Sequence, residues 1–261
     1  MARGKFITFE GCDGSGKSTQ LRLLSEYLTK NGIAHIFTRE PGGGKISEAI
    51  REILLSGKNM EMTDECEALL YAASRVQHLK DRVEPALAEG KLVICDRYVD
   101  SSFAYQAHAR GLGMDFIKKI NDYAIEKYLP EVTVFIDLTP EAAFKRKHGA
   151  DQNDRLELAG MEFHQRVYEG YKMVAEAEPE RVACVDGVFK TAFAGAVCHQ
   201  GTVIVKWKSE TTYLFAKPLF QLMFVCQHLS GYFFFAQPLK VRVCQAVAGY
   251  FMAFVQLHCL F

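Results

Sequence analysis

The chain has 261 residues, of which 49% are hydrophobic and 24% are charged, which is the balance of an ordinary globular protein. A chain of this length can bury a substantial core, as one large domain or as one domain with an appendage. Its formal net charge is zero, which gives no electrostatic reason to expect a nucleic-acid or membrane partner.

The eight cysteines form neither a Cys-x-x-Cys pair nor the Cys/His spacing of a zinc site. The first residues, MARGKFITFEG, contain no apolar signal core. We therefore expect reduced thiols and a cytoplasmic location.

Five apolar runs predict buried strands, at residues 5–9, 34–38, 91–95, 132–137 and 181–186. Helical spacing predicts helices over 17–30, 64–88, 114–128, 140–148 and roughly 155–177. Asp64 is the expected N-cap of the second helix, and Thr139-Pro140-Glu141 is typical of a helix start. This alternation predicts an α/β fold, a five-stranded parallel sheet with helices on both faces. Ligands should then bind at the carboxyl ends of the strands.

A glycine-rich segment between the first strand and the first helix fits the phosphate-binding P-loop pattern, Gly11-x-x-x-x-Gly16-Lys17-Ser18. Backbone N–H groups and the helix N-terminus of such a loop bind phosphate oxygens. Lys17 would reach the β and γ phosphates of a nucleotide, and the Ser18 hydroxyl would ligate Mg²⁺. The predicted nucleotide-binding residues are Gly11, Asp13, Gly14, Ser15, Gly16, Lys17, Ser18 and Thr19. The guanine-reading Asn-Lys-x-Asp element of a GTP-dependent switch does not occur.

Charged motifs follow two further strands. In TREPGG, at 38–43, Arg39 offers a guanidinium for a second anion, unless the motif is only a turn. In DRYVDSSFAYQ, at 96–106, Asp96 can hold Mg²⁺ through water, and Arg97 can fork onto a phosphate. The alternative is a simple salt bridge between the two.

Tyr71 and Arg75 lie four residues apart in the predicted helix 64–88, hence on one face. An aromatic ring and a guanidinium so placed can stack on a base and hydrogen-bond its edge. The alternative is a packed tyrosine beside a surface arginine.

Together these motifs resemble bacterial thymidylate kinases over residues 3–187. The shared segments, in the family's order, are FEGCDGSGKST, TREPGG, YAASRVQH, CDRYVDSSFAYQ, GLG at 111–113 and DRLE…EFHQRVYEGY at 154–171. The resemblance implies a P-loop nucleoside monophosphate kinase fold, a homodimer, and ATP with Mg²⁺ as phosphoryl donor to dTMP, giving dTDP. The alternatives are a kinase for another nucleoside monophosphate, and a nucleotide-binding protein that acts through its hydrophobic tail.

The resemblance also implies roles for individual residues. Tyr71 would stack on thymine, and Arg75 would read its O4. Arg39 and Arg97 would hold the dTMP phosphate, and Asp13 the sugar 3′-hydroxyl.

Tyr105 would crowd the sugar 2′ position and disfavour ribonucleotides, with Ser102 and Gln106 lining the same pocket.

Some members of the family carry an arginine in the P-loop, where this chain has Gly14. The chain is therefore similar to a second type, which supplies that cation from a mobile lid. Residues 144–157 would form the lid, unless they are only a solvated charge run. The expected catalytic cations are then Lys17, Arg97, Arg146 and Arg155.

The resemblance ends after VACVDG at 182–187. Residues 1–189 contain 25 Lys/Arg and 30 Asp/Glu, whereas residues 190–261 contain six basic residues and one acid, Glu210. We therefore predict a kinase-like domain of 1–189 and a Phe- and Cys-rich tail of 190–261. We expect the tail to be foreign to the kinase fold, as a shifted reading frame would make it, and its structure is not predicted. A genuine interaction or membrane-contact segment is the alternative, since 218–239 and 243–261 are uncharged.

Overall fold

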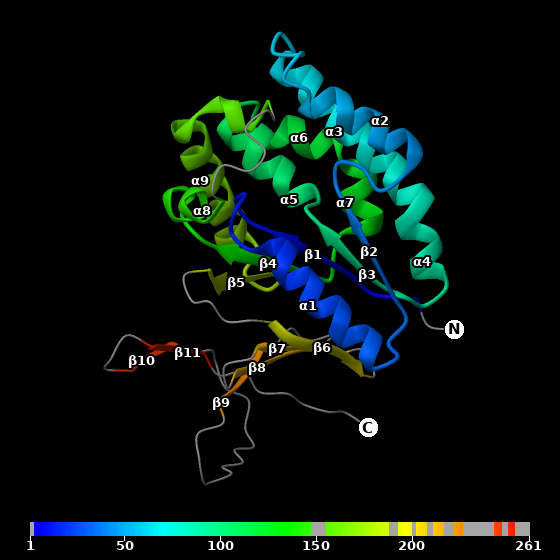
Figure 1. Ribbon diagram of the computed structural model, residues 1–261, viewed down its shortest axis with the longest axis vertical. Coiled ribbons are helices and arrows are strands. Elements are labelled where there is room, and N and C mark those ends of the chain that lie inside the picture. The colour runs from blue at the N-terminus through cyan, green and yellow to red at the C-terminus, as the bar shows by residue number, and fades with distance from the viewer. Residues whose placement is uncertain are drawn as a thin grey trace. The chain divides into compact units, whose positions relative to one another are not determined.

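The computed structural model describes residues 3–147 and 155–187, together with the backbone of six strands between 193 and 253 (Figure 1). The chain divides into two compact units. One consists of Met1–Ser18 and Ala34–Phe189, and the other of Thr19–Ile33 and Lys190–Phe261.

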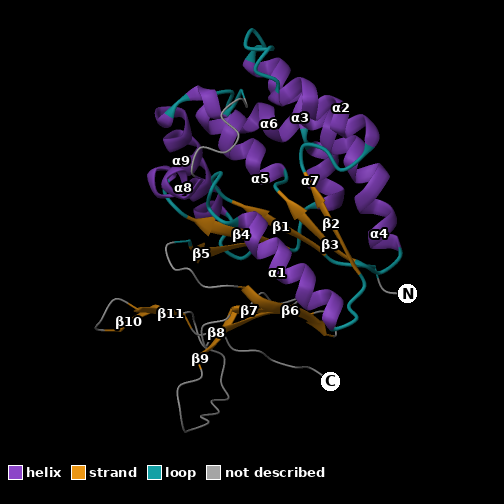
Figure 2. Cartoon of the chain, viewed as in Figure 1, coloured by secondary structure: helices purple, strands orange, loops and turns teal. Residues whose placement is uncertain are grey.

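A five-stranded sheet in which every neighbouring pair is parallel forms the centre of the first unit (Figure 2). Its strand order is β2-β3-β1-β4-β5, with β1 (Phe6–Glu10), β2 (His35–Arg39), β3 (Leu92–Asp96), β4 (Val132–Asp137) and β5 (Val182–Asp186). All five residues of β1 are buried, as expected for a central strand covered on both faces. The predicted parallel sheet is confirmed.

The register of the sheet brings the motif-bearing strand ends together. Asp96 at the end of β3 pairs with Phe9 on one side and with Arg39 on the other. Glu10, the next residue of β1, pairs with Phe135 of β4. The strand order reverses at β1, and the crevice at such a reversal is where open parallel sheets bind ligands.

Helical segments connect the strands. They are α1 (Lys17–Lys30), α2 (Lys45–Leu55), α3 (Asp64–His78), the π-helical η1 (Leu79–Val83), α4 (Glu84–Ala88), α5 (Val99–Ser102), the π-helical η2 (Phe103–Ala109), α6 (Met114–Ile120), α7 (Asp122–Tyr128), α8 (Pro140–Lys147), the 3₁₀ turn η3 (Glu157–Ala159) and α9 (Met161–Ala177). In the first unit, the buried core joins strand side chains to helix side chains, among them Phe6, Val93, Phe135, Leu79, Phe103 and Val167.

Several predicted helix boundaries need correction. The helix expected over 64–88 is present as α3, η1 and α4, but its N-cap is Thr63 instead of Asp64. Thr63 has an extended backbone, and its hydroxyl accepts a hydrogen bond from the Cys66 N–H at 3.3 Å. The segment 114–128 is divided at Asn121 into α6 and α7. The last helix begins only at Met161, because Gly160 before it has a φ of +86°.

One predicted helix start is confirmed, and two helical regions were not predicted. Thr139 begins α8 as predicted, since its hydroxyl accepts from the Ala142 N–H at 3.4 Å. Two helical regions were not predicted at all: α2, which follows the TREPGG turn, and α5 with η2, which carries the DRYVDSSFAYQ motif.

The described part of the tail is entirely β-structure. The first four strands form one antiparallel sheet and the last two a second: β6 (Phe193–His199), β7 (Thr202–Trp207), β8 (Thr211–Ala216), β9 (Leu222–Cys226), β10 (Val243–Ala246) and β11 (Tyr250–Ala253). Within the described residues, no helix combines the length and the apolarity needed to cross a bilayer. The uncharged stretches 218–239 and 243–261 lie mostly outside those residues. The proposal that the tail is foreign to the kinase fold stays a prediction.

Candidate functional site

The P-loop joins the end of β1 to the start of α1 and depends on glycine. Gly14 has a φ of +85°, and a Cβ atom on it would lie 2.3 Å from the carbonyl oxygen of Ala143 in α8. Backbone atoms cannot move aside as a flexible side chain could. No side chain therefore fits at position 14 while α8 keeps its place.

The predicted phosphate-binding lysine is buried in this loop. Lys17 Nζ donates to the carbonyl oxygens of Gly11 at 2.8 Å and Cys12 at 3.2 Å, and lies 3.8 Å from an Asp13 carboxylate oxygen. Burial, together with the Arg97 charge, lowers the pKa of Lys17. A cation held this way sits where phosphate oxygens bind to a P-loop.

Arg97 connects three elements at the carboxyl edge of the sheet. Its Nη2 donates to Asp13 Oδ1 at 2.7 Å and its Nη1 to the Tyr171 hydroxyl of α9 at 2.8 Å. Its guanidinium carbon lies 5.3 Å from the centre of the Tyr105 ring. The partner of Arg97 is thus the P-loop aspartate and not its neighbour Asp96. Its φ of +66° is rare for a residue with a side chain, and such strain is concentrated at functional sites.

Behind Arg97 lies a buried carboxylate that the sequence analysis did not single out. Glu10, at the end of β1, accepts hydrogen bonds from the Tyr98 N–H at 2.7 Å, the Ser101 hydroxyl at 2.7 Å and the Tyr171 hydroxyl at 2.8 Å. Burial, reinforced by the nearby Asp100, raises the pKa of Glu10 to about 7. A glutamate at the end of a mostly apolar central strand was the available signal.

The predicted Mg²⁺ ligands fit that ion. Asp96 Oδ1 is buried and has no hydrogen-bond partner among the described residues, which is unusual for a carboxylate oxygen. Burial and Arg97 lower the pKa of Lys17, and the nearby Asp96 carboxylate acts in the opposite direction and raises it. Ser18 is exposed on the first turn of α1. Mg²⁺ prefers such oxygen ligands and usually keeps several waters.

The TREPGG turn is organised by Glu48 of α2, a second residue that was missed. Arg39 Nη2 donates to both Glu48 carboxylate oxygens, at 3.0 and 3.1 Å, and the Gly43 N–H donates to one of them at 2.8 Å. Burial opposes ionisation of Glu48, but these donors outweigh it and lower its pKa. The Arg39 side chain remains 55% exposed, so it is accessible to a ligand.

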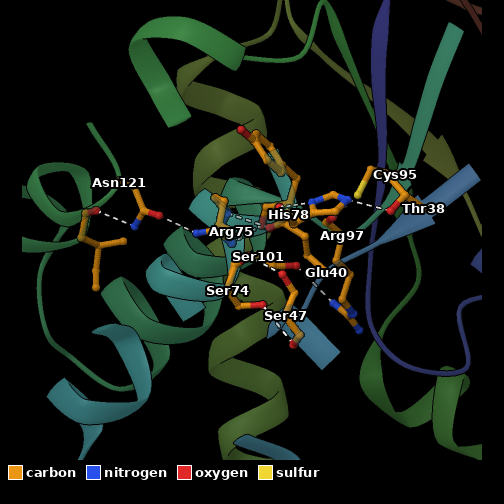
Figure 3. A network of polar contacts seen from close by, with 12 residues as sticks. Thr38, Glu40, Ser47, Ser74, Arg75, His78, Cys95, Arg97, Ser101 and Asn121 are labelled. Atoms are coloured by element: carbon orange, nitrogen blue, oxygen red, sulfur yellow. Dashed lines mark hydrogen bonds and ion pairs between the residues drawn. The ribbon is translucent and has the colours of Figure 1, made fainter. Parts of the chain in front are cut away.

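Arg75 is buried in a polar network, unlike the surface arginine of the alternative interpretation (Figure 3). Its Nε donates to Glu40 Oε2 at 2.7 Å, its Nη1 to Asn121 Oδ1 at 2.5 Å and its Nη2 to the Tyr98 carbonyl oxygen at 3.2 Å. Tyr71, one turn earlier on α3, is also buried.

The other predicted pocket residues, Ser102, Tyr105 and Gln106, are all buried on α5 and η2. The Tyr105 ring packs edge-on against Tyr171 with centroids 6.2 Å apart. Gln106 Nε2 donates to Glu67 Oε1 of α3 at 2.8 Å. Tyr105 and Gln106 thus contact α9 and α3, respectively.

The two predicted lid arginines differ in their surroundings. Arg146 is exposed on α8, and residues 148–154 of the predicted lid lie outside the described residues. Arg155 is 4% exposed, and its guanidinium donates to Glu67 Oε2 at 2.5 Å and to the Leu54 carbonyl oxygen at 3.0 Å. Arg110 shares the same carboxylate at 2.9 Å. Arg155 is thus ion-paired with α3 in this structure.

A parallel sheet of this order, with a P-loop after β1 and clustered cations at its carboxyl edge, defines a P-loop nucleoside monophosphate kinase fold. The "Thymidylate kinase" family model matches residues 9–192. The chain therefore belongs to the thymidylate kinase family.

Individual relatives agree with this assignment. The chain is similar to thymidylate kinases of Clostridium novyi, with 49% identity over 70% of the chain and 90% of the relative, and of Bacillus pumilus, with 50% identity over 70% and 87%. It is also similar to the crystal structure of thymidylate kinase from Ehrlichia chaffeensis, with 34% identity and a TM-score of 0.57, over 70% of this chain and 91% of that one.

Proposed function

We propose that this chain transfers the γ-phosphoryl group of ATP to dTMP, giving dTDP. The observation that carries the proposal is the meeting of Lys17, Asp13 and Arg97 at one edge of the sheet. In our proposal, Lys17 is the cation that binds the donor phosphates, and Arg97, on the other side of Asp13, is the cation that binds the acceptor phosphate. Membership of the thymidylate kinase family supports dTMP as the acceptor.

Phosphoryl transfer depends on in-line positioning and on neutralising charge more than on covalent chemistry. In our proposal, Lys17 and the P-loop N–H groups bind the ATP phosphates. Arg97 and Arg39 hold the dTMP phosphate, while Arg146 acts from the lid segment. Arg155 joins it on leaving Glu67, which keeps its ion pair with Arg110. Mg²⁺, held by Ser18 and through water by Asp96, would offset the charge of the β and γ phosphates.

The acceptor base and sugar would be bound by α3 and η2. Tyr71 stacks on thymine, and Arg75 donates to its O4. Asp13 binds the 3′-hydroxyl, and Tyr105, beside Ser102 and Gln106, disfavours a 2′-hydroxyl. The burial of Tyr71, Arg75, Ser102, Tyr105 and Gln106 supports a defined pocket, because buried side chains lose rotamer freedom before a ligand arrives.

One assay separates this proposal from its alternatives. ADP release is measured with ATP, Mg²⁺ and each of dTMP, dUMP, dCMP, UMP and GMP in turn. The proposal expects the highest kcat/KM with dTMP. A preference for another monophosphate would indicate a different kinase, and no turnover with any of them would favour a nucleotide-binding protein.

We also propose a cytoplasmic homodimer. Two pairs of large apolar side chains spaced by seven residues are exposed on neighbouring helices: Ile46 and Ile53 on α2, and Leu69 and Val76 on α3. Ser47 Oγ donates to the Ser74 carbonyl oxygen at 3.0 Å, which joins the two helices. Light scattering should give twice the chain mass, and Leu69→Glu should halve it; a monomeric wild-type chain would contradict the proposal.

A further inference from the structure

Three segments of the chain supply acceptors to the Arg75 guanidinium. Glu40 comes from the turn after β2, Tyr98 from the loop after β3, and Asn121 from the break between α6 and α7. Figure 3 shows Arg75 between Asn121 on one side and the Glu40–His78 pair on the other. The guanidinium is therefore fixed from several directions.

These contacts are also shielded from water. Arg75, Glu40 and Asn121 are 2%, 4% and 3% exposed, respectively. An arginine that left its carboxylate in such a place would leave both charges buried and unpaired, which is strongly unfavourable. The rotamer of Arg75 is therefore set before any ligand arrives.

Glu40 is itself held by a second chain of contacts. Its Oε1 lies 2.9 Å from Nδ1 of His78, and Nε2 of that ring lies 2.6 Å from the Thr38 hydroxyl. A neutral imidazole with its proton on Nδ1 satisfies both contacts. A Cβ atom on Gly43 would lie 2.6 Å from both the His78 ring and Thr38, so the turn packs directly against this pair.

The three hydrogen bonds occupy three of the five N–H groups of the guanidinium. Among the described residues, one N–H on each terminal nitrogen is left for a ligand. Both are donors, and arginine has no acceptor. Two fixed N–H donors can hydrogen-bond to the carbonyl oxygen of a base edge. They cannot hydrogen-bond to an amino group, whose N–H groups are also donors.

We propose that Glu40 and Asn121 are positioning residues that give Arg75 its power to distinguish a 4-oxo from a 4-amino pyrimidine. This inference rests on the proposed function and adds to it the residues that set base specificity. If the guanidinium could turn, it could move away from the amino group of dCMP, and the discrimination would fall.

The test compares kcat/KM for dTMP and dCMP in full-length wild type, Glu40→Gln and Asn121→Ala. Glutamine keeps the shape of Glu40 but can accept from only one of Arg75 and His78. We expect the dTMP/dCMP ratio to fall about tenfold in E40Q, through a higher KM for dTMP and a lower KM for dCMP. In N121A, which keeps the Glu40–Arg75 pair, it should fall about fivefold. The KM for ATP should stay within about twofold of wild type in both.

Asp100→Asn is the matched control. Asp100 is 1% exposed and pairs with the buried Arg181 through two hydrogen bonds of 2.7 Å, so this change also removes a carboxylate charge from a buried ion pair. It should lower Tm and leave the dTMP/dCMP ratio within about twofold of wild type.

The outcomes are distinguishable. If wild type does not phosphorylate dTMP, the proposed function fails. If wild type does, and folded E40Q and N121A keep the wild-type ratio, the positioning role is overturned. If E40Q does not fold by circular dichroism, N121A alone decides. A fall of equal size in D100N would show general loosening and would also overturn the inference.

Discussion

Nη2 of Arg97 lies 2.7 Å from Oδ1 of Asp13, so an ion pair joins the end of β3 to the P-loop. The same guanidinium reaches the Tyr171 hydroxyl, which in turn donates to the buried Glu10. The P-loop and α9 therefore fix one cation at the edge where two phosphates would meet. An arginine can do this because its planar fork offers several donors in fixed directions.

Arg97→Lys should test this geometry. A lysine ammonium keeps the charge but cannot span Asp13 and Tyr171 in the same way. We expect kcat/KM for dTMP to fall about a hundredfold, as for the loss of a positioned transition-state donor. Steady-state kinetics with a Tm measurement checks this. Near-normal kinetics in a folded variant would show that charge alone is enough.

Lys17→Ala should leave the fold intact and remove most phosphoryl transfer. The reason is the loss of a buried cation aimed at the charge that develops on the γ-phosphoryl group. Turnover of dTMP and a thermal melt are the two measurements. A well-folded variant with ordinary turnover would contradict the P-loop assignment.

Replacing the two predicted lid arginines, Arg146 and Arg155, should have different effects on protein stability. Arg146→Ala, at an exposed position, should lower kcat by orders of magnitude with a smaller loss of stability than Arg155→Ala. Arg155→Ala should lower kcat too, but it should also cost about 3 kcal/mol of stability, because it breaks a buried pair with Glu67. Kinetics and urea unfolding distinguish them. Normal turnover in both variants would exclude the lid mechanism.

Glu10 predicts a specific dependence of stability on pH. Its pKa is about 7 in the folded chain, against an ordinary value of 4.5. The fold therefore favours the protonated form, and this stabilisation is complete below pH 4.5 and is lost as the pH rises through 7. At about 1.4 kcal/mol per pKa unit, the loss by pH 8 is about 3 kcal/mol.

Urea unfolding of wild type and Glu10→Gln from pH 5 to pH 8 measures this effect. Glutamine has no proton to lose, so wild type should lose stability relative to the variant across that range. Parallel pH profiles would contradict the raised pKa.

Replacing residues 190–261 with a short amphipathic helix should raise solubility and keep the dTMP reaction. A Phe-rich tail with uncharged stretches at 218–239 and 243–261 favours association, and every predicted site residue lies at or before Arg155. Sedimentation of expressed protein and kcat/KM for dTMP are the readouts. Loss of folding on replacement would show that the tail belongs to the kinase domain.

The sequence predicted the strand pattern and the P-loop well, because both depend on local signals. Apolar runs mark buried strands directly, and glycine spacing marks a loop that needs positive φ. Arg97 was singled out because it directly follows a strand, and Lys17 because the P-loop pattern places it at the start of the first helix. These features need no knowledge of the rest of the fold.

Contacts between distant segments could not be predicted in this way. Glu48, Glu67 and Asn121 are polar residues in helical segments, and they acquire partners only when the helices pack. The burial of Arg155 is the same kind of effect, since its partner Glu67 lies 88 residues earlier. Sequence spacing reports the face of one helix, and it carries no information about which other segment covers that face.

The close approach of Gly14 to Ala143 has a consequence for how such an enzyme can change. An arginine at position 14 would be blocked by the backbone of α8 before it reached any phosphate. On the proposed lid mechanism, no single substitution can therefore transfer the cation from the lid to the loop. A lineage that moved the arginine from the lid to the P-loop would have to displace α8 and replace Gly14 at the same time. A variant with only the Gly14 replacement could not pack against α8.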